Sequence, residues 1–215
     1  MYFLSEGTEI VNAGNAVTQA RKKKTLVILG HPSEDSYCAA LANSYFEGSV
    51  SAGNPTRFLL LSRMTFDPVL HTGYRPPLQI LEPDLLIAQA GIEWAEHLVF
   101  VYPNWWGGMP ALMKGFIDRT FVPGFAFKYK DSTAAWDRLL TGKSARMIVT
   151  MDSPPWYFKW VNRAPGHNQM KRTILEFSGV RPVTITNIGP VKGASAVQRM
   201  KWIEEVSLLP ATELG

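Results

Sequence analysis

Residues 97–129 read HLVFVYPNWWGGMPALMKGFIDRTFVPGFAFKY, and this stretch carries the strongest indication of the fold. The apolar run Leu98–Tyr102 is followed by Pro103, which is typical of a buried parallel strand. A helix is predicted to begin at Pro110, because proline suits the first helical position. Apolar and small residues then repeat at helical spacing, which predicts a face packed on the sheet: Met113, Phe116, Ile117, Thr120 and Phe121.

The turn between this strand and helix contains Trp105, Trp106, Gly107 and Gly108. Two indoles beside two glycines would form a flat apolar wall next to freely shaped backbone. A planar, electron-accepting ring needs such a surface, so the turn is a candidate flavin cradle. Alternatively, both tryptophans are ordinary large residues of a core or an interface.

A second turn follows the apolar run Thr25–Gly30 and reads His31-Pro-Ser-Glu-Asp-Ser36 before a predicted helix. A strand that leads through a polar turn into a helix forms an anion site, because free amides and the helix dipole point at the ligand. Ser33 and Ser36 add hydroxyl donors. The turn has no cation, and Glu34 and Asp35 are acidic, so amides and hydroxyls would have to hold a phosphate. The alternative is a plain N-cap by Ser33 or Asp35.

Strands and helices alternate along the chain, which predicts an α/β fold with a parallel sheet and helices on both faces. Strands are expected at Thr25–Gly30, Thr56–Leu61, His97–Tyr102, Ala145–Met151 and Pro182–Ile188. Helices are expected near Ser36–Ser49, Pro83–Ala95, Pro110–Phe121, Gly166–Ser178 and Ala194–Val206. These elements fit a doubly wound sheet of order 2-1-3-4-5, in which ligands bind between the first and third strands. Arg63–Pro83 is predicted to be a long connection.

The fourth predicted strand is followed by Asp152-Ser-Pro-Pro-Trp-Tyr157, and His167 comes at the start of the next helix. The phenol of Tyr157 and the imidazole of His167 could assist hydride transfer at a flavin edge. His167 could instead be a core-edge or capping residue, and His71 and His97 are interpreted as structural. No cluster has the spacing of a metal site.

Composition narrows the class of protein. The 215 residues are 46% hydrophobic and 19% charged, with a net charge of +4, which is typical of a globular domain. The basic run at residues 21–24 lacks interleaved aromatics, so no nucleic-acid partner is expected. A single cysteine, Cys38, fits a reducing cytoplasm, and no run is long enough for a membrane span. We expect residues 1–24 to be an N-terminal extension and residues 25–215 to be one flavin-binding domain.

The motifs HPSEDSYCAAL, FDPVL and YPNWWGGMPALMKGFIDRTFVPGFAFKY, with Tyr157 and GHNQM, resemble a known family. The chain resembles the NAD(P)H:quinone oxidoreductases, flavoproteins of flavodoxin-like fold that include regulatory partners of bacterial potassium-efflux systems. The resemblance covers about Thr25 to Val206. It implies contacts with the flavin phosphate and ribityl chain from His31, Ser33, Ser36, Tyr37 and Cys38. It implies isoalloxazine contacts from Pro103, Asn104, Trp105, Trp106, Thr150, Met151, Asp152 and Ser153.

By the same resemblance, Tyr157 and His167 would assist hydride transfer, and Phe127 and Tyr129 would reach the active site of a second subunit in a homodimer. Cys38 stands where some members have asparagine, and Asp152-Ser153 replaces a glycine pair of the mammalian enzymes. The loop before His167 is longer than theirs. The chain lacks the long carboxyl-terminal extension of the larger mammalian enzymes, which favours FMN as the cofactor and leaves FAD as the alternative.

The resemblance therefore implies an enzyme that passes hydride from NAD(P)H through FMN to a quinone or similar flat acceptor by a ping-pong mechanism. A regulatory subunit that binds a potassium-efflux transporter at the membrane periphery remains an alternative. So do a flavodoxin-like electron carrier and a non-catalytic flavin sensor.

Overall fold

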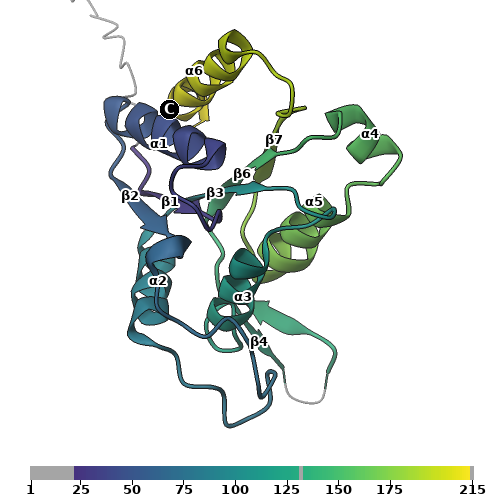
Figure 1. The fold of residues 1–215 in the computed structure, drawn as a ribbon. Helices are drawn as coiled ribbons and strands as arrows, with labels where there is room; N and C mark the ends of the chain where they lie inside the picture. Colours follow the sequence, from purple (N-terminus) through teal and green to yellow (C-terminus); the bar gives the residue numbers. More distant parts are fainter. Residues whose placement is uncertain (1–21, 131–132, 214–215) are drawn as a thin grey trace, which may run out of the picture.

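The computed structural model describes residues 22–130 and 133–213 and has a parallel sheet at its centre (Figure 1). The strands are β1 (Thr25–Leu29), β2 (Thr56–Leu60), β3 (His97–Pro103), β6 (Ser144–Thr150) and β7 (Val183–Ile188). Their order across the sheet is β2-β1-β3-β6-β7, and every neighbouring pair is parallel. Counted along the chain this is 2-1-3-4-5, so the predicted doubly wound, flavodoxin-like arrangement is confirmed.

Helices cover both faces of the sheet, which explains why its central strands are almost continuously apolar. On one face lie α1 (Tyr37–Ser51) and α6 (Ala196–Glu213). On the other lie α2 (Pro83–Trp94), α3 (Ala111–Thr120), α5 (Pro165–Asn168) and η2 (Gln169–Glu176). Alternate residues of β1 supply the two cores: Leu26 and Ile28 pack on the α2–α3 side, and Val27 and Leu29 pack on the α1–α6 side.

The element boundaries differ from the sequence predictions in several places. The helix predicted at Gly166–Ser178 is a short α-helix, α5, continued by the π-helix η2. The last helix begins at Ala196, where Ser195 Oγ accepts from the amide of Gln198 (3.1 Å), and it extends to Glu213. Pro110 is the N-cap of α3, not its first residue.

Two further elements were not predicted. The helix α4 (Pro155–Trp160) follows β6 in a segment for which no helix was predicted, and Pro155 is well suited to its first position. The short antiparallel hairpin of β4 (Phe127–Tyr129) and β5 (Trp136–Arg138) lies apart from the main sheet. Strands of this length leave too little alternation to be recognised from sequence.

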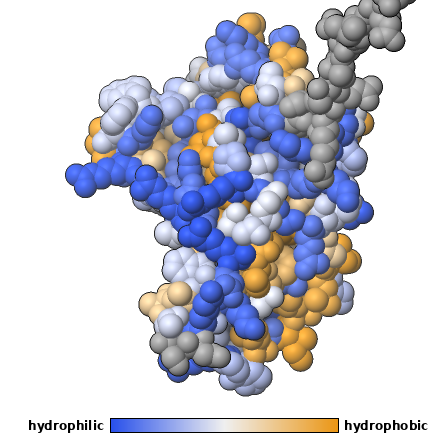
Figure 2. Space-filling view, turned by 180° about the vertical axis from the view of Figure 1, so that it is seen from behind, coloured by the Kyte–Doolittle hydropathy of each residue, from blue (hydrophilic) through white to orange (hydrophobic). Residues whose placement is uncertain are grey.

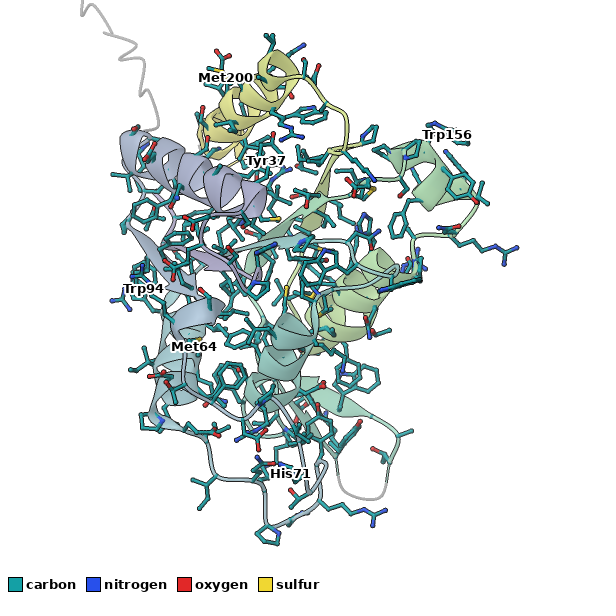
Figure 3. All side chains as sticks on the ribbon, viewed as in Figure 1. Tyr37, Met64, His71, Trp94, Trp156 and Met200 are labelled. Atoms are coloured by element: carbon teal, nitrogen blue, oxygen red, sulfur yellow. The ribbon has the colours of Figure 1, made fainter. Side chains whose placement is uncertain are left out.

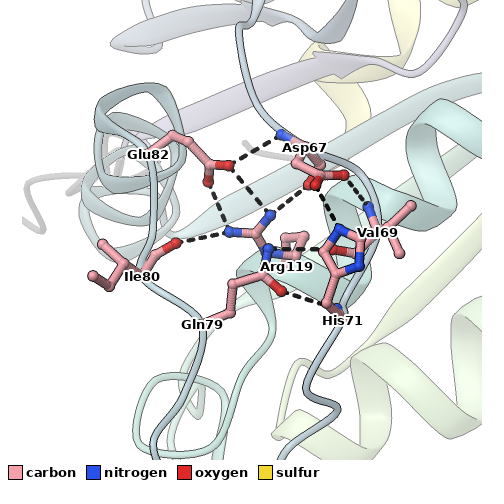
Figure 4. Close-up of polar contacts among 7 residues, drawn as sticks. All are labelled: Asp67, Val69, His71, Gln79, Ile80, Glu82 and Arg119. Atoms are coloured by element: carbon pink, nitrogen blue, oxygen red, sulfur yellow. Dashed lines mark hydrogen bonds and ion pairs between the residues drawn. The ribbon is translucent and has the colours of Figure 1, made fainter.

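A buried arginine organises the long connection between β2 and α2, which begins with the 3₁₀ helix η1 (Leu61–Arg63) (Figure 4). Arg119 of α3 is fully buried and forms a two-point ion pair with Glu82, with its shorter contact at 2.7 Å. Its guanidinium also donates to the carbonyls of Asp67 and Ile80. His71 joins the same network through Asp67 at 2.8 Å. The predicted long connection is therefore ordered by side-chain contacts.

Residues 1–21 of the predicted extension lie outside the described residues, so that part of the domain prediction stays a prediction. Within the predicted extension, the amides of Lys23 and Lys24 already join the fold, through Asn54 (3.1 Å) and Glu96 (3.1 Å). Across residues 22–130 and 133–213, none of the helices combines the length and the apolar composition that crossing a membrane requires.

Candidate active site

The turns that follow β1, β3 and β6 converge at the carboxyl edge of the sheet. The rings of His31 and Trp105 meet edge to face with centroids 5.6 Å apart, which joins the first two turns. The amide of Asn104 donates to the carbonyl of Thr150 (2.7 Å), and Sγ of Cys38 lies 3.2 Å from Oγ1 of Thr150. These contacts connect the third turn to both others. The structure therefore brings these three turns together at the switch point of the sheet.

The turn after β1 presents hydrogen-bond donors at the start of α1. Ser36 is the N-cap, and its Oγ accepts from the amide of Ala39 at 3.2 Å, so neither Ser33 nor Asp35 caps the helix. The first-turn amides of Tyr37 and Cys38 have no partner within a helix. The amide of Ser33 donates to Nδ1 of His31 (2.9 Å), which fixes the imidazole beside the turn. This donor set suits an anion.

Sequence reasoning missed the residue that neutralises the acidic part of this turn. Arg63, at the end of η1, binds both carboxylate oxygens of Glu34, at 2.7 and 2.5 Å. The hydrogen bonds from Arg63 lower the pKa of Glu34, so this carboxylate is charged and paired. A phosphate at the start of α1 would therefore meet a compensated charge. Arg63 lies 29 residues from Glu34 along the chain, and no local pattern connects them.

The turn after β3 is a two-residue hairpin closed by two hydrogen bonds between Trp105 and Gly108 (2.9 and 3.0 Å). Trp106 (φ 53°) and Gly107 (φ 83°) occupy the left-handed region, as a type I′ turn requires. Trp106 is fully exposed and Trp105 nearly half exposed, so neither is a core residue within this chain. Trp105 contacts His31 at the carboxyl edge of the sheet, whereas Trp106 is fully exposed to solvent.

Some of the remaining residues predicted to bind the cofactor are buried at the strand ends, and others contact neighbouring elements through their side chains. Pro103, Thr150 and Met151 are buried at the strand ends, beside partly exposed Asn104 and Ser153. The hydroxyl of Tyr37 donates to the carbonyl of Arg199 on α6 (2.8 Å), so its side chain points toward α6 (Figure 3). Asp152 accepts from the amide of Lys192 (2.9 Å) and so joins the turn after β7 to the site.

Cys38 is buried, and burial raises the pKa of its thiol to about 11. It is therefore a neutral thiol at pH 7 and donates or accepts only through Thr150. A thiol in this state contributes packing to the core between α1 and the sheet.

A close backbone contact brings the start of α5 against the turn after β3. A Cβ atom on Gly166 would lie 2.4 Å from the carbonyl oxygen of Gly107 and 2.8 Å from Cα of Gly108. Only glycine fits at such a separation. Gly166 of the Gly-His-Asn motif therefore allows these two segments to pack together, a role that was not predicted from the sequence. The contact brings the start of α5, in which His167 follows Gly166, against the turn after β3.

His167 is buried and held from two sides. Its Nε2 lies 2.6 Å from Oδ1 of Asn187 on β7, and its ring packs edge to face on Phe158 of α4 with centroids 4.9 Å apart. Burial lowers the pKa of His167, although the Asn187 contact opposes the shift. The imidazole is therefore neutral at pH 7. It donates from Nε2 to Asn187, which leaves Nδ1 as a proton acceptor.

Tyr157 precedes Phe158 on α4 and is 41% exposed. Its ring packs edge to face on Trp156, which stands at the outer end of the molecule (Figure 3). Tyr157 on α4 and His167 on α5 therefore lie on neighbouring helices, and Phe158, next to Tyr157 in the chain, contacts the ring of His167. Nε2 of His167 bonds to Asn187 and not to Tyr157.

Phe127 and Tyr129 lie on the hairpin, in an aromatic cluster beside α3 and η2. Phe127 is only 8% exposed, and it packs on Tyr74 and Phe177 of its own chain. Tyr129 is exposed and could contact another molecule. The role predicted for both residues at a second subunit stays a prediction, and the burial of Phe127 favours Tyr129 as the residue that could fulfil it.

The other histidines have structural surroundings. His97 is buried at the start of β3, where Nδ1 lies 2.8 Å from Oγ of Ser144. Burial, aided by Lys23 and Arg146, lowers the pKa of His97 to about 3. Among the residues that the structure describes, no three His, Cys, Asp or Glu side chains gather in a way that could hold a metal ion.

Comparison with known proteins agrees with this geometry. A family model described as flavodoxin-like fold matches residues 23–206. The chain is 33% identical over 134 residues to a Haemophilus influenzae protein named uncharacterized NAD(P)H oxidoreductase, with 60% of this chain covered. It is 30% identical over 129 residues to the Cavia porcellus NAD(P)H dehydrogenase (quinone) 1, with 51% of this chain covered. The matched part spans 64% and 47% of the lengths of these two relatives.

A solved structure also shares the fold. The NAD(P)H:quinone oxidoreductase from Methanothermobacter marburgensis superposes with a TM-score of 0.75 and 21% identity, covering 89% of this chain and 98% of that one. At this identity the likeness shows the fold alone, and that fold agrees with the family model and with the order of the strands in the sheet.

Proposed function

Since the chain belongs to the family of proteins with a flavodoxin-like fold, we propose that it is a flavin-dependent NAD(P)H:quinone oxidoreductase. In this proposal, hydride passes from NAD(P)H through bound FMN to a quinone or similar flat acceptor in ping-pong order. The observation that carries the proposal is the contact between His31 and Trp105, which joins an anion-binding turn to an exposed indole wall.

The residues at the turns after β1 and β3 would fit a flavin mononucleotide. The amides of Tyr37 and Cys38 and the hydroxyl of Ser33 suit the phosphate, and the Glu34–Arg63 pair removes the repulsion that this acidic turn would otherwise exert. The face of Trp105 suits a flat ring. When bound, the flavin supplies the two-electron chemistry, and the protein supplies orientation and electrostatics.

We assign proton chemistry to two side chains. His167 is neutral, with Nδ1 free to accept a proton, and Asn187 holds the ring in that tautomer. Tyr157 offers a phenol hydroxyl at an exposed position on the neighbouring helix. Both substrates are flat, and one indole-lined face would receive each in turn, which is the reason for proposing ping-pong order. A homodimer and a cytoplasmic location remain predictions.

Two measurements test the proposal. The purified protein should show a flavin absorption band that bleaches with NAD(P)H and returns with a quinone. Tyr157→Phe and His167→Ala should each slow flavin reduction by about 10-fold or more while the flavin stays bound, as expected for positioned acid–base groups. His71→Gln, an exposed histidine of the long connection, is the matched control and should reduce at the wild-type rate. A colourless protein that does not take up added FMN would contradict the proposal.

A further inference from the structure

A cavity of about 420 Å³ lies beside His167 between α4, α5, η2 and β7. Its cationic side chains are Lys159, Arg163, Lys171 and Arg172, its floor includes His167 and Asn187, and Trp160 stands at its rim. The fold brings Arg163 and Arg172 to one cavity from two different elements.

The charge of this cavity is not compensated by the protein. No carboxylate belongs to its lining. Within the described ranges, Lys159, Arg163 and Arg172 have no ion-pair partner, and Lys171 reaches Glu176 only at 4.0 Å. Like charges gathered around one cavity repel each other, and an anion would relieve that repulsion. Seen from behind in Figure 2, a continuous hydrophilic band crosses the side of the molecule that carries α4, whereas hydrophobic surface gathers on the side of α2.

Backbone contacts hold Arg163 in place. Arg163 (φ 59°) and Ala164 (φ 46°) both adopt the left-handed conformation, which is costly for residues other than glycine. The side-chain Nδ2 of Asn168 donates to the carbonyl of Arg163 (2.8 Å), and the backbone amide of Ala164 donates to the carbonyl of Phe158 (2.9 Å). The segment before α5 is therefore fixed with Arg163 on the wall of the cavity.

The lining combines groups for a phosphate with a surface for a flat ring. Guanidinium groups bind phosphate oxygens with two parallel hydrogen bonds, and a phosphate monoester carries more than one negative charge at pH 7. Trp160 is 73% exposed, and Nζ of Lys159 lies over one face of its ring, 5.1 Å from the centroid, so the opposite face is the one that could stack on a base. An adenosine phosphate matches both features better than a simple inorganic anion.

We propose that this cavity binds the 2′-phosphorylated adenosine end of NADPH and makes the protein prefer NADPH to NADH. His167 lines the cavity, and the preceding Gly166 packs on the turn after β3 at Gly107, so one extended dinucleotide could reach from the cavity to that turn. This inference rests on the proposed function for its physiological meaning. The binding site itself can be tested without any redox reaction.

The first experiment titrates the protein with 2′,5′-ADP and with 5′-AMP by calorimetry, at low and high salt. The 2′,5′-ADP should bind at least 10-fold more tightly, and its affinity should fall as salt rises. Arg163→Asn, which tolerates the left-handed conformation, and Arg172→Ala should each weaken 2′,5′-ADP about 10-fold and leave 5′-AMP nearly unchanged. Arg172→Lys should restore part of the affinity. Lys201→Ala on α6 is the control for loss of one surface cation.

The second experiment measures steady-state kinetics with both nicotinamides. In Arg163→Asn and Arg172→Ala the KM for NADPH should rise about 10-fold, with unchanged kcat and an unchanged KM for NADH. Thermal melting of each variant should match the wild type, because both side chains are exposed.

Several outcomes would overturn the inference. Equal affinity for 2′,5′-ADP and 5′-AMP, or for 2′,5′-ADP and pyrophosphate, would show that the cavity does not recognise the 2′-phosphate. Arginine-dependent binding to anionic lipid vesicles without 2′,5′-ADP binding would assign the cations to a membrane surface instead. If flavin is reduced equally by NADH and NADPH in all variants, the proposed function stands and the inference fails. If 2′,5′-ADP binds as expected but no flavin binds, the inference stands and the proposed function fails.

Discussion

Gly166→Ala tests whether the close contact between α5 and the turn after β3 positions the candidate site. The added Cβ would lie 2.4 Å from the Gly107 oxygen and 2.8 Å from the Gly108 Cα, and no real Cβ sits that close to backbone. The obstacle cannot rotate away, since it belongs to a hairpin closed by two hydrogen bonds and strained at Trp106. The segments must therefore move apart.

The expected loss of stability follows from two opposing terms. Overpacking costs about 1–3 kcal/mol, and a rigid backbone obstacle places this case near the upper value. Replacing a helical glycine by alanine returns up to about 1 kcal/mol. The net destabilisation is about 2 kcal/mol, which for a chain of this size lowers the Tm by about 4–8 °C.

The same displacement should affect reactivity. His167 directly follows Gly166. A shift of α5 by a few tenths of an ångström therefore moves the imidazole relative to the turns after β1 and β3. Misplacement on the order of 1 Å can cost about 100-fold in rate, so we expect flavin reduction to slow by about 10-fold or more. Stopped-flow absorbance and thermal melting followed by circular dichroism measure the two effects.

Gly108→Ala is the matched control, because its Cβ would meet nothing closer than the Trp105 oxygen at 4.0 Å. Its stability should stay within about 0.5 kcal/mol of the wild type. A Gly166→Ala protein that melts within about 1 °C of the wild type would refute the packing argument. If Gly166→Ala lowers the Tm as expected but leaves the rate of flavin reduction unchanged, the position of α5 does not control that reaction.

Other expectations concern stability and thiol reactivity. Arg119→Met should cost about 3 kcal/mol in urea unfolding by leaving Glu82 and two carbonyls without their donor, whereas Lys114→Met, which removes an exposed pair on the same helix, should cost less than about 1 kcal/mol. His97 has a folded pKa of about 3, so the unfolded state takes up a proton first as pH falls below about 6.5. Stability should therefore drop by about 2 kcal/mol between pH 7 and pH 5, and His97→Gln should remove that part of the pH dependence. Cys38, with a pKa of about 11, should react with iodoacetamide at pH 8 about 100-fold more slowly than a free thiol, and a rate near that of free cysteine would contradict its burial.

The fold could be predicted from the sequence because the patterns that mark strands and helices are local. Apolar runs and helical periodicity mark strands and helices wherever each element buries its own residues, and the strands at 25–29 and 97–103 were recognised in this way. The topology rule for parallel sheets then brought the turns after β1, β3 and β6 to one edge. Three features were not predicted from the sequence: the hairpin of β4 and β5, the helix α4 and the π-helical geometry of η2. The strands and α4 are too short for a clear periodic pattern, and a π-helix has a sequence pattern similar to that of an α-helix.

Residue types and motif spacing alone were enough to nominate the turns at His31, Trp105 and Tyr157 and to connect them with a redox cofactor. Tertiary structure alone decided the electrostatics and the side-chain partners. Arg63 compensates Glu34, Asn187 sets the tautomer of His167, and Arg163 and Arg172 share a cavity, although these residues are separated along the chain. The physical reason is that charge pairing, desolvation and close backbone contact depend on distances in space, and those distances exist only after the sheet and its helices have packed.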